Sequence, residues 1–250
     1  MGADAPIPDE PIVLLATGGA PDGPTALPPS LPAGSLVVAA DAGLARLHDA
    51  GIEAHHLVGD LDSVRPELVA DAIARGTTVH RHLPDKDATD LELALDLIVG
   101  ELAPRAGLGR LLVVGPGGGR LDHLLADLLA LSAEPLADLE VTARLGAATV
   151  EVVRAGRPRA VTGAVGDALS LLPVHGPARG VTTTGVRWPL VDADLVAGTT
   201  RAMSNELTAP IAQIALHEGV LVSLRPGLTA PTVPPRATAY DPTPRAGGDR

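Results

Sequence analysis

The sequence contains no cysteine, which excludes disulfide bonds, thiolate catalysis and cysteine-ligated zinc. It has no phenylalanine, one tryptophan and one tyrosine, so its core must be packed with aliphatic side chains. No apolar run approaches the ~18 residues that a membrane-spanning helix requires. The first eleven residues are acidic and proline-rich and lack the basic start of a signal peptide. These absences predict a soluble cytoplasmic protein that does not interact with membranes.

Basic residues are also scarce, because 19 Lys and Arg stand against 30 Asp and Glu and give a formal net charge of −11. Nucleic-acid binding requires clustered positive charge on the protein, so nucleic acid is not an expected partner. What the chain does have is apolar mass. With 250 residues, 46% of them hydrophobic, it can bury the core of one large domain or of two modest ones.

The first half of the chain alternates short β-like runs with helical patterns, which is typical of a parallel sheet covered by helices. One helix is indicated by apolar residues at 91, 94, 95 and 98, with a capping box formed by Thr89 and Glu92. A second has leucines at 121, 124, 125 and 128. The expected strands are residues 12–16, 36–39, 56–58, 77–80 and 111–114. We therefore predict a Rossmann-like, mostly parallel α/β domain over residues 1–135.

The pattern changes from about residue 139, where short apolar runs are separated by Gly, Pro and Asp. Many short strands with frequent turns predict an antiparallel β-sandwich, expected over residues 136–226. The runs are residues 148–153, 168–172, 180–186, 211–216 and 220–224. Residues 227–250 are rich in Pro, Gly, Thr and Arg and are predicted to be a disordered tail.

A set of aspartates follows the strand-like runs of the first domain. They are Asp41, Asp60, Asp62, Asp87, Asp90 and Asp122. In an open α/β sheet the carboxyl ends of the strands meet at one edge, where ligands bind. Carboxylates crowded there repel by roughly 4 kcal/mol per pair at ~4 Å and an effective dielectric of ~20. A Mg²⁺ ion removes that penalty and also holds substrate phosphates, so the sequence predicts metal-assisted phosphoryl chemistry.

Two further segments combine charge with a helix N-terminus. Residues 85–90 contain three acids and Lys86, an arrangement in which backbone amides and the lysine could hold phosphate while the acids hold metal. A solvated surface that merely caps a helix is an equal alternative for this segment. A glycine-rich loop, residues 115–119, precedes Arg120, Asp122 and His123. It suits close approach to a phosphate, although a tight turn before a capped helix explains it too.

The single tryptophan, Trp188, lies beside Arg187 and Pro189 in the second half of the chain. A lone tryptophan is more often a core residue than a ligand platform, but its indole face suits flat or cationic ligands. The segment Ser204-Asn205-Glu206 reads by itself as a polar turn.

Taken together, these segments resemble the thiamine pyrophosphokinase (thiamine diphosphokinase) family. The matching motifs are Ala40-Asp41-Ala42-Gly43, Gly59-Asp60-Leu61-Asp62-Ser63, Asp87-x-Thr89-Asp90-Leu91-Glu92, Gly118-Gly119-Arg120-Leu121-Asp122-His123, Thr183-Thr184-Gly185-Val186-Arg187-Trp188-Pro189-Leu190 and Ser204-Asn205-Glu206. Each is weak alone, but the six occur in the family's order. The chain departs from the family at Ala42 and Ala45, where the first motif usually has glycine and asparagine.

The resemblance implies a diphosphate transfer from ATP to the hydroxyl group of thiamine, in a homodimer that binds thiamine near the subunit interface. It implies that Asp60, Asp62 and Asp90 are the main Mg²⁺ ligands. The nucleotide and diphosphate would be bound by residues that surround them, namely Asp41, Lys86, Asp87, Thr89, Gly118, Gly119, Arg120 and Asp122. Thiamine would be bound by Trp188, Ser204 and Asn205, with Trp188 acting either within its own subunit or across the interface with the partner.

The sequence leaves several alternatives open. Either Asp90 or Asp122 could accept the proton of the attacking hydroxyl group. The substrate could be another hydroxymethyl heterocycle, such as a pterin, although the segments around Trp188 and Asn205 argue against it. A non-catalytic thiamine-binding protein is the third possibility, and the retained acids argue against that.

Overall fold

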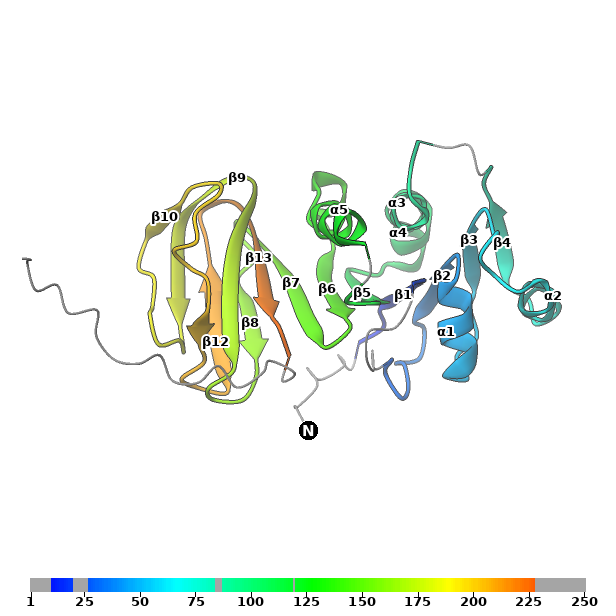
Figure 1. Cartoon of the computed structure of the whole chain (residues 1–250), viewed down its shortest axis with the longest axis horizontal. Helices are drawn as coiled ribbons and strands as arrows, with labels where there is room; N and C mark the ends of the chain where they lie inside the picture. Colours follow the sequence, from blue (N-terminus) through cyan, green and yellow to red (C-terminus); the bar gives the residue numbers. More distant parts are fainter. Residues whose placement is uncertain (1–9, 20–26, 84–86, 119, 228–250) are drawn as a thin grey trace, which may run out of the picture.

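A computed structural model describes residues 10–19, 27–83, 87–118 and 120–227 of the chain. One end of the molecule is a helix-covered parallel sheet and the other is built of antiparallel strands (Figure 1). The two are joined through hydrogen-bonded strands in the order β4-β3-β2-β1-β5-β6-β7-β13-β9-β12-β8. The predicted disordered tail falls almost entirely outside the described residues.

The parallel part of the sheet contains all five predicted strands. They are β1 (Val13–Thr17), β2 (Leu36–Ala40), β3 (His56–Gly59), β4 (Thr78–Arg81) and β5 (Arg110–Gly115). A sixth strand, β6 (Glu140–Leu145), pairs in parallel with β5. β6 was not predicted, because every second residue in it is polar. One of these polar residues, Arg144, is buried.

Helices cover both faces of the parallel sheet, which is why its central strands β1, β2 and β5 are mostly apolar. On one face α1 (Gly43–Asp49) and α2 (Pro66–Ala74) bury Leu44, Leu47 and Leu68. On the other, α3 (Asp90–Leu97) continues through a π-helical turn, η1 (Ile98–Leu102), into α4 (Ala103–Ala106). The helix α5 (Leu121–Leu131) follows β5, as predicted. Within the described residues, no helix is long and apolar enough to span a bilayer.

The second half of the chain is antiparallel, and the predicted sandwich is confirmed. A short 3₁₀ turn, η2 (Glu134–Leu136), precedes it. Its strands are β7 (Ala148–Arg154), β8 (Arg159–Thr162), β9 (Ala168–Thr184), β10 (Ala193–Leu195), β11 (Asn205–Glu206), β12 (Ile211–Ala215) and β13 (Glu218–Arg225). A separate aliphatic core fills the space between them, with Val153, Leu171 and Ile214 among its members. The domain boundary near residue 135 stays a prediction.

The long strand β9 differs from the prediction, which treated residues 168–172 and 180–186 as two strands. The first half of β9 pairs with β13 and its second half pairs with β12. The polar, proline-containing stretch between them is an irregularity within one strand, because the register shifts opposite Gly219. Positive φ angles at His175 (60°) and Gly176 (142°) accommodate that shift.

Candidate active site

The acids of the first domain gather where β2 and β3 end. Asp41 follows β2 with a positive φ of 46°, and its backbone N–H donates to the carbonyl oxygen of Val58 on β3 (2.8 Å). Carboxylate oxygens of Asp41, Asp60 and Asp62 all lie within 4.8 Å of one another. Local backbone turns, rather than long side chains, therefore bring these three carboxylates together.

Gly59 and Leu61 shape the loop that carries Asp60 and Asp62. Leu61 has a φ of 67°, so the chain turns between the two acids and Leu61 is buried. The side chain of Asp60 accepts a hydrogen bond from the backbone N–H of Asp62 (3.1 Å). A Cβ atom at Gly59 would lie 3.1 Å from Oδ1 of Asp90 and 3.2 Å from Cβ of Asp41. The glycine thus allows Asp90, the first residue of α3, to stand beside the other acids.

The electrostatics of this cluster fit a bound divalent cation. The carboxylate of Asp60, followed by desolvation and the charge of Asp41, raises the pKa of Asp62. One carboxylate oxygen of Asp41, Oδ1, is buried without a hydrogen-bond partner among the described residues, whereas Oδ2 accepts from the hydroxyl group of Ser63. A hard cation with oxygen ligands would satisfy that oxygen and offset the repulsion. Asp41, Asp60 and Asp62 therefore lie close enough to share one ion, and Asp90 stands beside them at Gly59.

Neighbouring loops pack against this edge of the sheet at close range. A Cβ atom at Gly43 would lie 2.0 Å from the carbonyl oxygen of Ala16, so only glycine allows α1 to begin there. Ala42 is one of the two departures from the motif of the resembled family. It fits because residue 18 is glycine, whose added Cβ would lie 2.6 Å from that of Ala42.

The residues around α5 form a second, separate group. Arg120 donates to both carboxylate oxygens of Asp122 (3.2 and 2.6 Å). This hydrogen bonding lowers the pKa of Asp122 to about 2, so its carboxylate is ionised at neutral pH. Both side chains are exposed, and in the described part of the chain Asp122 does not join the group of acids at β2 and β3. The glycine-rich loop places Gly118 before this pair.

The structure describes two of the four remaining residues that were predicted to bind the nucleotide. Lys86 and Gly119 lie outside the described residues. Asp87 is exposed in the turn before α3. Thr89 caps that helix, with its hydroxyl oxygen accepting from the backbone N–H of Glu92 (3.2 Å), as the capping box predicted.

The predicted thiamine-binding residues lie together in the sandwich. Trp188 has 56% of its surface exposed, and the guanidinium of Arg187 stands 4.9 Å from the centre of its ring. The buried side-chain amide of Asn205 accepts from the backbone N–H of Trp188 (3.1 Å) and donates to its carbonyl oxygen (2.8 Å). Ser204 has a φ of 54°, and its backbone N–H donates to Ser170. In this chain Asn205 holds the tryptophan loop in place.

One chain does not bring the acids and Trp188 together. The acids follow β2 and β3, whereas Trp188 follows β9, and five strands separate β2 from β9 in the sheet. At ~4.8 Å per strand spacing, the two groups are roughly 29 Å apart along the sheet. Figure 1 shows β2 and β3 toward one end of the molecule and β9 and β10 at the other.

Sequence reasoning missed two residues that shape the site. Gly59 appeared only as part of a motif, although the crowding of Asp41 and Asp90 around it is what requires a glycine. Ser63 also appeared only as the last residue of that motif, and its hydroxyl group donates to Asp41. The sequence signal for Ser63 was its position directly after the acid pair Asp60 and Asp62.

Comparisons with known proteins agree with this geometry. A family model described as "Thiamin pyrophosphokinase, catalytic domain" matches residues 30–142, and "Thiamin pyrophosphokinase, vitamin B1 binding domain" matches residues 159–221. The chain is 26% identical over 191 residues to thiamine pyrophosphokinase of Bacillus subtilis, covering 76% of this chain and 87% of that protein.

Solved structures show the same fold. Thiamin pyrophosphokinase from Geobacillus thermodenitrificans superposes with a TM-score of 0.69 at 27% identity, covering 88% of this chain and 99% of that one. The yeast thiamin pyrophosphokinase gives a TM-score of 0.64 at 18% identity, covering 88% and 87% of the two chains.

Proposed function

The chain belongs to the thiamin pyrophosphokinase family, and we propose that it transfers the diphosphate group of ATP to the hydroxyl group of thiamine. The products are thiamine diphosphate and AMP. The single observation that carries this proposal is the convergence of Asp41, Asp60 and Asp62 at the carboxyl ends of β2 and β3, with Asp90 beside them. We retain a cytoplasmic location as a prediction.

Asp60, Asp62 and Asp90 would hold Mg²⁺, with Asp41 next to them. When bound, the ion would neutralise charge on the ATP phosphates and align them for in-line attack by the hydroxyl group. The chain's own contribution is mainly positioning, because phosphoryl transfer needs little covalent help from a protein. Gly59 and Leu61 fix the loop that carries the first two acids, and the capped N-terminus of α3 fixes Asp90.

The remaining site residues would bind phosphate and accept a proton. Lys86, Arg120 and the amides around Gly118 and Gly119 are proposed to contact the nucleotide, with Asp87 and Thr89 near them. Of the two candidate bases, Asp122 is disfavoured because Arg120 engages it through two hydrogen bonds, and Asp90 would have to accept the proton on an oxygen that does not bind the ion. A doubly hydrogen-bonded carboxylate with a pKa of about 2 is a poor proton acceptor.

Thiamine is proposed to bind against the exposed indole face of Trp188, whose loop is held by Asn205 and adjoins Ser204. A cationic, flat ring suits such a face. Because the acids and Trp188 lie in different halves of the chain, we propose a homodimer in which one subunit provides the acids and its partner provides the tryptophan.

The direct test is incubation with ATP, Mg²⁺ and thiamine, followed by chromatographic detection of AMP and thiamine diphosphate. A parallel reaction with a hydroxymethyl-pterin tests the alternative substrate, which the match to a vitamin B1 binding domain does not favour. We expect AMP only with thiamine. AMP formation with the pterin alone would transfer the assignment to that substrate, and thiamine binding without AMP would indicate a non-catalytic protein.

A further inference from the structure

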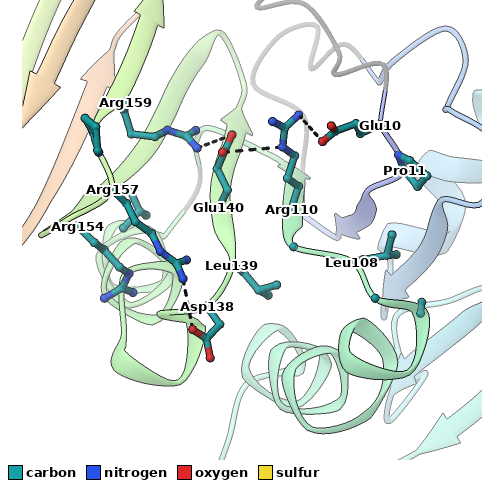
Figure 2. A pocket seen from close by; sticks show the side chains of 15 residues that line it. Glu10, Pro11, Leu108, Arg110, Asp138, Leu139, Glu140, Arg154, Arg157 and Arg159 are labelled. Carbon is teal, nitrogen blue, oxygen red and sulfur yellow. Dashed lines mark hydrogen bonds and ion pairs between the residues drawn. The ribbon is translucent and has the colours of Figure 1, made fainter.

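A cavity lies at the end of the parallel strands that is opposite the acid cluster. It has a volume of about 620 Å³ and opens where β5 and β6 begin and β7 ends (Figure 2). Along β5 (Arg110–Gly115) the rise from one end to the other is about 17 Å, so the cavity is distinct from the acid cluster. Ligand pockets in proteins typically measure about 300–1,000 Å³, and this cavity falls within that range.

Arginine dominates the charged lining of this cavity. Four arginines come from β5, from the end of β7 and from the segment that leads into β8, and they face three carboxylates. The arginines are Arg110, Arg154, Arg157 and Arg159. The cavity thus has an excess of positive charge in a chain whose net charge is −11.

Two of these guanidinium groups are fixed in place. Arg154 is buried and donates from Nη2 to the carbonyl oxygens of Ser132 (2.8 Å) and Ala133 (2.6 Å). Its Nε is buried without a hydrogen-bond partner among the described residues. Arg159 lies 2.6 Å from Glu140, and although burial lowers its pKa to about 10, it remains charged at neutral pH. They provide permanent positive charge beside the cavity.

The other two arginines each keep one contact, Arg110 with Glu140 (3.8 Å) and Arg157 with the carbonyl oxygen of Ala137 (2.8 Å), and each has a second contact that a ligand could replace. Arg110 is 3.6 Å from Glu10, and Arg157 is 3.4 Å from Asp138. Glu10 has 75% of its side chain exposed, and the side chain of Asp138 is fully exposed. Exposed ion pairs of this kind contribute little to stability, so an incoming anion can displace these carboxylates readily.

We propose that this cavity binds a small metabolite through an oxyanion, a phosphate or a carboxylate, held between Arg110 and Arg157. Guanidinium groups match both oxyanions with paired hydrogen bonds. The rest of the lining includes aliphatic residues such as Pro11, Leu108 and Leu139, and it contains no aromatic residue that could stack on a base. The ligand is therefore expected to be a compact anion rather than a nucleotide. This site is independent of the proposed diphosphate transfer.

Calorimetric titration of the full chain with inorganic phosphate and, separately, with succinate tests the proposal. EDTA is included because anion binding at the acid cluster would need a metal ion, and sodium chloride of matched ionic strength provides the blank. We expect at least one of the two anions to bind. Binding of phosphate alone would indicate a phosphate ester as ligand, and binding of succinate alone would indicate a carboxylate.

The double variant Arg110→Gln/Arg157→Gln should weaken that binding roughly tenfold or more, because charge-assisted hydrogen bonds are lost. Arg105→Gln is the matched control, since Arg105 is an exposed arginine paired with Glu101 outside the cavity. Arg157→Gln alone, at a half-exposed side chain, provides a second variant if the double one unfolds. Absence of binding by the unmodified chain, or equal affinity in the Arg157 variants, would overturn the proposal.

Discussion

At the scale of single residues, backbone conformation decides which acids can meet. Asp41 and Leu61 have positive φ angles, and Gly59 leaves room for Asp90. Non-glycine residues seldom adopt such angles, and when they do the strain is often found at functional sites. The cluster at β2 and β3 combines that strain with mutual repulsion among carboxylates, and both are accounted for by a site that binds a cation.

Replacement of Trp188 tests the proposed thiamine site. Trp188→Ala should raise the KM for thiamine about tenfold or more, since a cation–π contact that the bound ligand desolvates contributes about 2 kcal/mol. The KM for ATP should change less than about twofold, because the nucleotide is proposed to bind at the acids. Steady-state kinetics with each substrate varied in turn measures both. Val191→Ala is the matched control, an exposed apolar residue near Trp188. Equal effects on the two KM values would contradict the assignment.

The proposed thiamine-binding residues show what could not be predicted from the sequence. The pattern identified Trp188 and Asn205 as members of one site. It could not show that the amide of Asn205 is bonded to the backbone of Trp188, 17 positions away. That bond depends on the short pairing of β11 with β9, which no local periodicity in the sequence records.

At the scale of elements, the sandwich contains a buried ionisable residue that the proposed chemistry does not use. Glu151 on β7 pairs across the sheet with Ser223 on β13, near Arg225. Burial raises the pKa of Glu151 to about 7, an effect that the charge of Arg225 and the hydroxyl group of Ser223 only partly offset. Its protonation should therefore couple the stability of these two strands to pH.

The direction of that coupling follows from the raised pKa. Between about pH 4.5 and about pH 7 the unfolded chain ionises Glu151 while the folded chain keeps it protonated. Folding stability from this group is therefore present below the lower value and is lost as the pH rises, by about 3 kcal/mol in all. Glu151→Gln should remove this loss.

Urea unfolding of the unmodified chain and of Glu151→Gln at pH 5 and pH 8 measures this pH-dependent loss of folding stability. The advantage of the variant should be about 2 kcal/mol larger at pH 8 than at pH 5. Glu218→Gln, an exposed position on β13, is the control and should show no such change. A constant difference between Glu151→Gln and the unmodified chain at both pH values would refute a neutral, buried Glu151.

Elements were largely predictable from sequence. The apolar runs that became β1, β2, β3 and β5 were visible because both faces of the parallel sheet are covered. The edge strand β4 carries polar residues and is only partly buried. The prediction failed at β6, where polar residues alternate, and at β9, where a proline-containing irregularity was read as a turn. In both cases long-range pairing overrides the local signal.

At the scale of the whole molecule, the order of the strands separates the two groups of site residues. Five strands lie between β2 and β9. Within a single chain, thiamine bound to Trp188 would therefore be too far from ATP bound at the acids for the two to react. The order of strands depends on pairings between distant segments, such as β13 between β7 and β9, and the sequence does not reveal them. The proposed shared site in a symmetric dimer would bring the two groups together.

Complementation between two impaired variants tests the shared site, with thiamine kept far below its KM so that Trp188→Ala alone is slow. A mixed dimer of Asp62→Asn and Trp188→Ala subunits contains one site with neither change and one site with both. After dissociation and reassociation of equal amounts, about a quarter of the original activity should return, because half of the dimers are mixed. Each variant taken alone through the same treatment is the control. Recovery no greater than the sum of the two variants would place both groups in one subunit or in independent sites.

The most direct test of the account is the rate of Mg²⁺-dependent AMP formation by Asp62→Asn, measured together with thiamine binding. Thiamine binding can be followed by fluorescence, since Trp188 is the only tryptophan in the chain. The account predicts a fall in kcat of at least about 100-fold, because a carboxylate that holds the cation is lost, while thiamine still quenches Trp188 with unchanged affinity. Retention of most of the turnover by Asp62→Asn would contradict the claim that these acids form the metal site.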